Sequence, residues 1–190
     1  MPPTVKKRGK NIVCDRNRSP RRNAGPEDIL AMSGANPDGG GISWWDGERL
    51  RVFKNVDPLK VVGFIYSHWE QLRHAPCLIH FRLATHGAVE PRNCHPFRTD
   101  RGYVAHNGIA HDYEDGPYAS DSRNMVEAWI DSGYDNSVFD GQGPVALITP
   151  HAASNGWRAR RLNAVGAYGS PTCLGIGEQV FGRVVRHALI

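Results

Sequence analysis

Three short stretches between residues 80 and 108 carry most of the information about the fold. They are HFRLATHG at His80–Gly87, NCHPF at Asn93–Phe97 and AHNG at Ala105–Gly108. The first continues an apolar run, which predicts a buried strand that ends in a polar loop. Side chains two residues apart share one face of a strand, so His80 and Arg82 are expected to point the same way.

The residue types in these stretches suit the recognition of a small polar molecule. An arginine at the end of a strand can hold a carboxylate through two parallel hydrogen bonds. His106-Asn107-Gly108 predicts a strand and a tight turn, where a side-chain amide and a backbone N–H can point into one space and form an oxyanion hole. Asn-Gly is also a common structural turn, so it is the three stretches together that indicate a site.

The chain on either side predicts a mixed α and β fold. Helices are expected at about 26–34, 58–75 and 122–130, where proline or an acidic residue stands at the start and apolar residues recur with helical period. Strands are expected at 41–45, 49–54, 77–84, 102–105, 144–149 and 157–162. The strands are grouped rather than alternating with helices, which indicates an α+β fold with a largely antiparallel sheet. Ordered structure is expected to begin at about Pro26.

Composition and charge exclude several classes of protein. A chain of 190 residues with 40% hydrophobic residues is long enough for one domain with its own core. It has no apolar run that could span a bilayer, and its four cysteines have no spacing typical of secreted scaffolds, so we expect a cytoplasmic protein that makes no membrane contact. Residues 1–25 hold eight of the 23 Lys and Arg residues, so the net charge of +4 comes from that end. Nucleic acid is therefore a disfavoured partner, although the basic arm leaves it open.

A zinc site is the alternative for the cysteines and histidines near these stretches. Cys77 and His80 have suitable side chains, as do Cys94 and His95. Cys77 and His80, however, differ by three positions on a strand and should point to opposite faces. Because no closed ligand set follows, neither a metal nor another cofactor is expected.

In their order and spacing, five segments resemble the class II glutamine amidotransferase domain of the N-terminal-nucleophile (Ntn) hydrolase superfamily. They are the three stretches above together with Asn36–Ile42 and Ser120–Ser122. The chain looks most like the small standalone members found in bacteria and phages. The resemblance implies a four-layer αββα sandwich that hydrolyses the side-chain amide of glutamine, or of a γ-glutamyl-type amide, through a cysteine thioester.

The resemblance also implies roles for individual residues. Arg82 would hold the substrate α-carboxylate, and Asp121 would hold its α-amino group. Asn107 and Gly108 would stabilise the oxyanion. Thr85 and His86 would line the pocket. Asp38-Gly39 would lie in a turn near the nucleophile. Asp121 also fits a simple helix cap. A separate ammonia-accepting synthase is a possible partner beside the small-molecule substrate.

The family's nucleophile is an N-terminal cysteine whose own α-amine acts as the base, and Cys14 is the best candidate here. It precedes the Asn36–Ile42 segment at about the family's distance, whereas Cys77, Cys94 and Cys173 are interpreted as buried thiols. The catalytic form would then begin at Cys14. Residues 1–13 would be a dispensable extension, removed by proteolysis or lying upstream of a start at Val13, and 14–190 would form the domain.

Two other functions remain open. The run that follows Cys14, DRNRS, has poor strand propensity, so the chain can instead be an inactive relative that serves as a binding or interaction module. The second is nucleic-acid binding through the basic arm.

Overall fold

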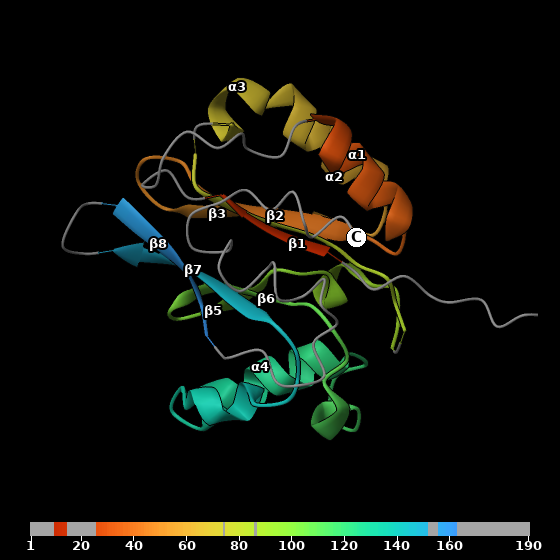
Figure 1. Ribbon diagram of the computed structural model, residues 1–190, viewed down its shortest axis with the longest axis vertical. Coiled ribbons are helices and arrows are strands. Elements are labelled where there is room, and N and C mark those ends of the chain that lie inside the picture. The colour runs from red at the N-terminus through yellow and green to blue at the C-terminus, as the bar shows by residue number, and fades with distance from the viewer. Residues whose placement is uncertain (1–9, 15–25, 74, 86, 152–155, 163–190) are drawn as a thin grey trace, which may run out of the picture.

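A computed structural model describes residues 10–14, 26–73, 75–85, 87–151 and 156–162. Two four-stranded sheets lie in the middle of this part of the chain, with helices on both outer sides (Figure 1). All neighbouring strands pair antiparallel. The expected α+β fold of four layers is confirmed.

The first sheet has the strand order β1-β4-β2-β3. Its strands are β1 (Lys10–Cys14), β2 (Gly40–Trp45), β3 (Leu50–Asn55) and β4 (Cys77–Phe81). Its helices are α1 (Pro26–Ala35), α2 (Pro58–Ser67) and α3 (Trp69–Leu72). Ile29 and Met32 of α1 pack with Val61 and Ile65 of α2 in the core between these helices and the sheet.

The second sheet has the order β5-β6-β7-β8. Its strands are β5 (Phe97–Thr99), β6 (Gly102–His106), β7 (Val145–His151) and β8 (Gly156–Arg161). Helix α4 (Asp121–Asp131) covers its outer side and buries Met125 and Trp129 against Val104 and Leu147. Short 3-10 helices lie at η1 (Pro91–Asn93), η2 (His111–Tyr113) and η3 (Asn136–Phe139).

Local sequence accounts for the helix starts. Asp57 caps α2 by accepting a hydrogen bond from the Leu59 N–H at 2.9 Å, and Pro58 occupies the first turn. Ser120 caps α4 by accepting from the Arg123 N–H at 3.4 Å. Asp121 is therefore the first helical residue and not the cap.

Four expectations about the elements were wrong in detail. The first described element is β1 and not the helix at Pro26, because Lys10–Cys14 pairs along the whole of β4. Strand β5 was missed because it has only three residues. The expected helix over 58–75 is split at His68 into α2 and α3, and β4 ends at Phe81, not at Ala84.

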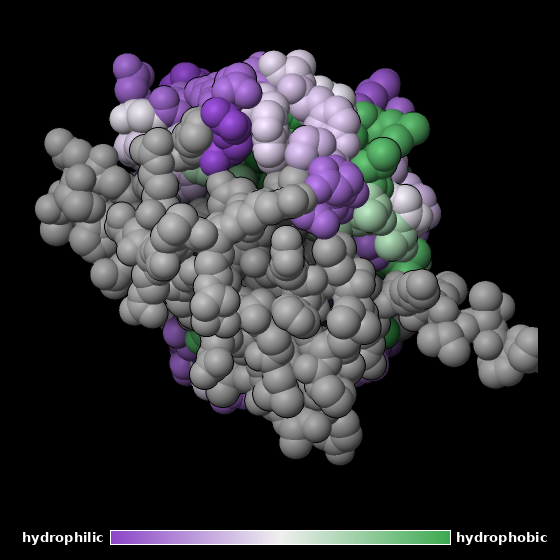
Figure 2. All heavy atoms as spheres, turned by 45° about the horizontal axis from the view of Figure 1, so that its top comes forward, coloured by the Kyte–Doolittle hydropathy of each residue, from purple (hydrophilic) through white to green (hydrophobic). Residues whose placement is uncertain are grey.

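The outer surface over α1, α2 and α3 is mostly hydrophilic, with some hydrophobic residues at one side (Figure 2). Leu30 and Leu59 are among the exposed large hydrophobic residues. Within the described residues, no helix has the length and apolar character needed to cross a membrane.

Candidate active site

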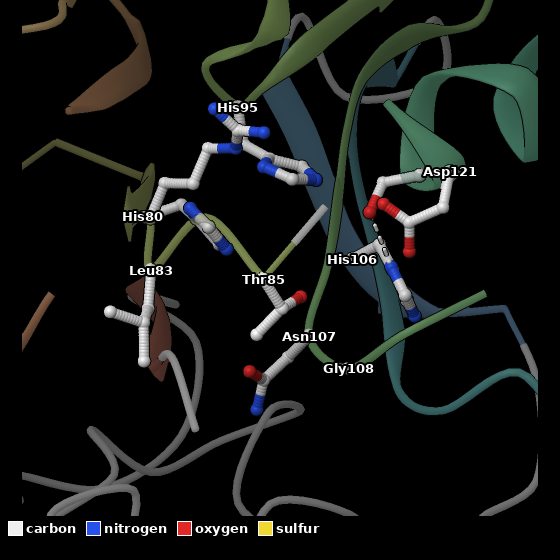
Figure 3. Close-up of a pocket in the computed structure, with 10 residues that line it drawn as sticks. His80, Leu83, Thr85, His95, His106, Asn107, Gly108 and Asp121 are labelled. Atoms are coloured by element: carbon white, nitrogen blue, oxygen red, sulfur yellow. Dashed lines mark hydrogen bonds between the residues drawn. The ribbon is translucent and has the colours of Figure 1, made fainter. Parts of the chain in front are cut away.

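A polar pocket lies where the central strands β4 and β6 end. Its walls come from the loop after β4, from His95, from the turn after β6 and from the start of α4. The residues that line it are His80, Arg82, Leu83, Thr85, His95, His106, Asn107, Gly108, Asp121 and Ser122. Figure 3 shows Asp121 on one side and His80 and Leu83 on the other, with Thr85 and Asn107 between them.

Arg82 directly follows β4 and is only 5% exposed. Its backbone is held on both sides by the Asp38-Gly39 turn, because its N–H donates to the Gly39 carbonyl at 2.8 Å and its carbonyl accepts from the Asp38 N–H at 3.0 Å. The Asp38 carboxylate accepts a further hydrogen bond from the Ala84 N–H at 2.8 Å. The Asp38-Gly39 turn therefore fixes the strand end from which Arg82 extends.

The loop after Arg82 is fastened to the segment before α4. The guanidinium donates to the Ala88 carbonyl at 2.9 Å, and Asn93 Nδ2 donates to the carbonyls of Ala88 and Ala119 at 3.1 and 3.0 Å. A Cβ at Gly87, whose φ is +78°, would lie 1.8 Å from the Ala119 carbonyl oxygen. This close approach requires glycine and brings the Arg82 loop next to the start of α4.

Asp121 brings a buried negative charge to the same pocket, since it is 8% exposed. Its Oδ2 accepts a hydrogen bond from the Ala110 N–H at 2.7 Å. It stands in the first turn of α4, at the positive end of the helix dipole. Arg82 and Asp121 thus supply one buried cation and one buried anion to a single cavity.

Asn107 and Gly108 form the turn after β6. The Asn107 N–H donates to the Pro144 carbonyl at 3.0 Å, which fixes the backbone of the turn. Gly108 has a φ of +146°, a conformation that side-chain-bearing residues rarely adopt. The turn therefore places the amide side chain of Asn107 and the backbone of Gly108, which carries no side chain, at the pocket.

Three histidines at the pocket were noted in the motifs but were not among the predicted site residues. His80, His95 and His106 are all at most 4% exposed, and the His80 and His95 rings lie 4.0 Å apart. Burial lowers the pKa of His80 to about 3 and also lowers the pKa values of His95 and His106. All three are therefore neutral at physiological pH. Their positions within the motifs, His80 and His106 close to Arg82 and Asn107 and His95 close to Asn93, were the signal that could have identified them.

The pairing of β1 puts the backbone of Cys14 at the end of the strand furthest from this pocket. In the register of β1 and β4, Cys14 lies opposite Cys77, while Lys10 lies opposite Phe81, the residue before Arg82. Antiparallel strands rise about 3.4 Å per residue, so the backbone of Cys14 is roughly 13 Å from the site end of β1. β1 also includes residues 10–13, which were expected to belong to a dispensable extension.

The other described cysteines, Cys77 and Cys94, are buried, as expected. Burial raises the pKa of Cys94, whose Sγ would lie 2.7 Å from a Cβ at Gly39, so this thiol packs against the Asp38-Gly39 turn. Cys173 and the predicted pocket residue His86 lie outside the described residues. Nowhere in the described ranges do three or more His, Cys, Asp or Glu side chains gather in a way that could hold a metal ion.

Comparisons with known proteins show the family of this chain. The family model described as "Glutamine amidotransferases class-II" matches residues 25–124, which is more than half of the chain. A glutamine–fructose-6-phosphate aminotransferase (isomerizing) of Helicobacter pylori is 33% identical over 76 residues, which are 40% of this chain and 13% of that protein. A probable glutamine–fructose-6-phosphate aminotransferase (isomerizing) of Schizosaccharomyces pombe is 32% identical over 105 residues, which are 51% of this chain and 15% of that protein.

The matches therefore cover only a small part of these much longer relatives. The matched family segment ends just after the start of α4, so it includes every described residue of the pocket. The fold, the order of the motifs and the family match lead to one conclusion: the chain belongs to the class II glutamine amidotransferase family.

Proposed function

We propose that the pocket binds glutamine, or another γ-glutamyl-type amide, by its charged end and its amide together. Arg82 pairs with the α-carboxylate, Asp121 with the α-ammonium group, and Asn107 and Gly108 donate hydrogen bonds to the amide oxygen, while Thr85 forms the rim. One observation carries this proposal: a buried arginine and a buried aspartate line one cavity together with the Asn107-Gly108 turn. A zwitterionic ligand compensates both buried charges at once.

The reaction that fits this recognition is cleavage of the amide by Cys14 in a form of the chain that begins at that residue. The α-amine of Cys14 takes the thiol proton, and Sγ attacks the amide carbon. Asn107 and Gly108 stabilise the oxyanion of the tetrahedral intermediate. The C–N bond then breaks, and the nitrogen leaves with the transferred proton as ammonia. Water hydrolyses the thioester to the free carboxylate, and a separate synthase is the proposed acceptor of the ammonia.

This reaction requires Cys14 to occupy the site end of the strand. Loss of residues 1–13 removes four of the five residues of β1, and the new N-terminus must pair with β4 four positions further along. Cys14 would then lie opposite Phe81.

The register of β1 favours a second candidate for the chain that retains these residues. With Cys14 opposite Cys77, the full chain binds the amide without cleaving it and acts as a binding module. Nucleic-acid binding through residues 1–25 has less support, because the polar pocket and the family match both favour a small-molecule ligand.

The test compares the full chain with a chain that begins at Cys14. Glutamine binding is measured by calorimetry and ammonia release by a glutaminase assay, with labelling by diazo-oxo-norleucine as a readout of the nucleophile. We expect both forms to bind glutamine and only the shorter form to release ammonia and to be labelled at Cys14. Binding by both forms without ammonia release would establish the binding module instead.

Two controls make the comparison specific. Arg82→Gln should abolish glutamine binding in both forms, whereas Arg73→Gln, a matched arginine on the C-terminal side of α3, should not. Ammonia release that survives Cys14→Ala would contradict the assignment of the nucleophile, and failure of both forms to bind glutamine would contradict the proposal as a whole.

A further inference from the structure

His106 is held by two hydrogen bonds at opposite ends of its ring. Nε2 lies 2.6 Å from the Gln142 carbonyl oxygen, and Nδ1 lies 2.8 Å from Ser122 Oγ. A carbonyl can only accept, so Nε2 must carry the proton. Because burial keeps the ring neutral, Nδ1 is then the acceptor and the Ser122 hydroxyl donates to it.

The ring so fixed stands at the base of the Asn107-Gly108 turn. A Cβ at Gly108 or at Gly143 would lie 3.3 Å from His106 Nε2, so two glycines pack closely on the imidazole. A Cβ at Gly143 would also lie 2.8 Å from the Asn107 carbonyl oxygen. A reorientation of the ring would therefore displace the turn.

Helix α4 ties both ends of this turn to its first residues. Ser122 bonds to His106, at the start of the segment 106–110, and Asp121 bonds to the Ala110 N–H, at its end. Both residues of α4 are at most 8% exposed. The carboxylate proposed to hold the ammonium group and the donors proposed to hold the amide oxygen are thus fixed relative to each other through one helix start.

We propose that Ser122 is a positioning residue, which orients the imidazole of His106 and thereby holds the Asn107-Gly108 turn in place for the amide oxygen. Ser122 need not touch the substrate to act in this way. The part of this inference that concerns ligand binding rests on the proposed function, while the part that concerns the ring and the turn does not.

The test uses the full chain with Ser122→Ala and the conservative Ser122→Thr, and Ser67→Ala as the matched control. Ser67 is an exposed serine of α2 whose hydroxyl donates to the Phe64 carbonyl, far along the chain from this network. Nitrogen-15 NMR reports the protonated nitrogen of His106, with His106→Gln identifying the signal, and amide hydrogen exchange reports the order of the turn.

We expect the Nε2–H form in the unaltered chain. Removal of one partner from a buried ring nitrogen should speed amide exchange in segment 106–110 about tenfold in Ser122→Ala, and weaken glutamine binding by about the same factor. In Ser122→Ala, amide exchange in the core of the first sheet should stay within about twofold of the unaltered chain. In Ser122→Thr and Ser67→Ala, both the exchange of segment 106–110 and the affinity for glutamine should stay within about twofold.

Other outcomes overturn the inference. An Nδ1–H form in the unaltered chain would reverse the assigned donor and acceptor. If amide exchange in Ser122→Ala rises by the same factor throughout the protein, the substitution lowers stability in general. If exchange of segment 106–110 rises as much in Ser122→Thr as in Ser122→Ala, the hydroxyl does not position the turn. If no variant binds glutamine, the proposed function fails, while the ring and exchange measurements still decide the role of Ser122.

Discussion

Cys14 and Cys77 face each other in the β1–β4 register, at the end of the strand pair furthest from Arg82. Since β4 lies between β1 and β2 in the sheet, β1 supplies hydrogen-bond partners along one whole edge of this buried strand. The pairing that puts the backbone of Cys14 at the far end of the strand pair therefore also covers β4, the strand that leads to the pocket.

A chain that begins at Cys14 should accordingly be less stable than the full chain. The polar run after Cys14 has poor strand propensity, so it should replace the hydrogen bonds of Lys10–Val13 only in part. Net loss of several strand hydrogen bonds, each worth about 0.5–1.5 kcal/mol, should lower the free energy of unfolding by roughly 2–4 kcal/mol. Urea titration followed by circular dichroism measures the difference, with a chain that begins at Lys10 as the control. Equal stability of all three chains would show that the run after Cys14 pairs with β4 as well as β1 does.

Substitution of Asp121 should change ligand recognition selectively. In Asp121→Asn the carboxylate that pairs with the ammonium group is lost, so we expect at least about tenfold weaker binding of glutamine. An analogue of glutamine that lacks only the α-amino group should bind both proteins equally. Calorimetry with the two ligands gives the comparison. An equal loss for both ligands would mean that Asp121 acts by holding Ala110 and not by pairing with the substrate.

Asn107 should matter more for the reaction than for binding. In the chain that begins at Cys14, Asn107→Ala should lower kcat by about 100-fold to 1000-fold with a smaller change in KM, because an oxyanion donor acts mainly in the transition state. The glutaminase assay measures both parameters. A rise in KM at unchanged kcat would assign Asn107 to ground-state binding.

The buried histidines should make the folded protein sensitive to acid. The folded pKa of His80 is about 3, below its ordinary value of 6.5, so the unfolded chain binds more protons between these values. Stability is therefore complete above about pH 6.5 and falls as the pH drops toward 3. For His80 alone the free energy of unfolding should fall by about 2 kcal/mol between pH 7 and pH 5.

Urea titrations at the two pH values test this, and His80→Gln should show a correspondingly smaller difference. His95 and His106 should act in the same direction, because burial lowers their pKa values too. A protein that is equally stable at pH 5 and pH 7 would contradict the buried, neutral state of these rings.

Two glycines should respond in opposite ways to alanine. A Cβ at Gly41 would lie 2.4 Å from the His95 carbonyl oxygen, so Gly41→Ala should cost about 2 kcal/mol or more and disturb the pocket wall. Gly63, on the exposed side of α2, has nothing within 4 Å of such a Cβ, so Gly63→Ala should stabilise by about 0.5–1 kcal/mol. Thermal or urea unfolding of the two variants shows whether each substitution lowers or raises the free energy of unfolding.

Much of the fold was predictable because its signals are local. Asp57 with Pro58 indicated the start of α2, and Asp46-Gly47 indicated the hairpin turn between β2 and β3. Short runs predicted as strands also correspond to β4 and β6. The glycines of Gly39–Gly41 were visible as part of a motif. Their physical reason was not, since it lies in contacts with Cys94, Phe81 and His95, which are 40 or more residues away in the chain.

The sequence by itself determined the family, because its short motifs stand in a fixed order, and it pointed to four residues that line the pocket: Arg82, Asn107, Gly108 and Asp121. Only the tertiary structure decided which residues the motifs bring together. Pairing of β1 with β4 depends on register, which no single segment specifies, and that register placed Cys14 at the far end of the strand. Packing of α4 on the second sheet likewise joined Ser122 to His106, a contact between side chains 16 residues apart that neither motif implies.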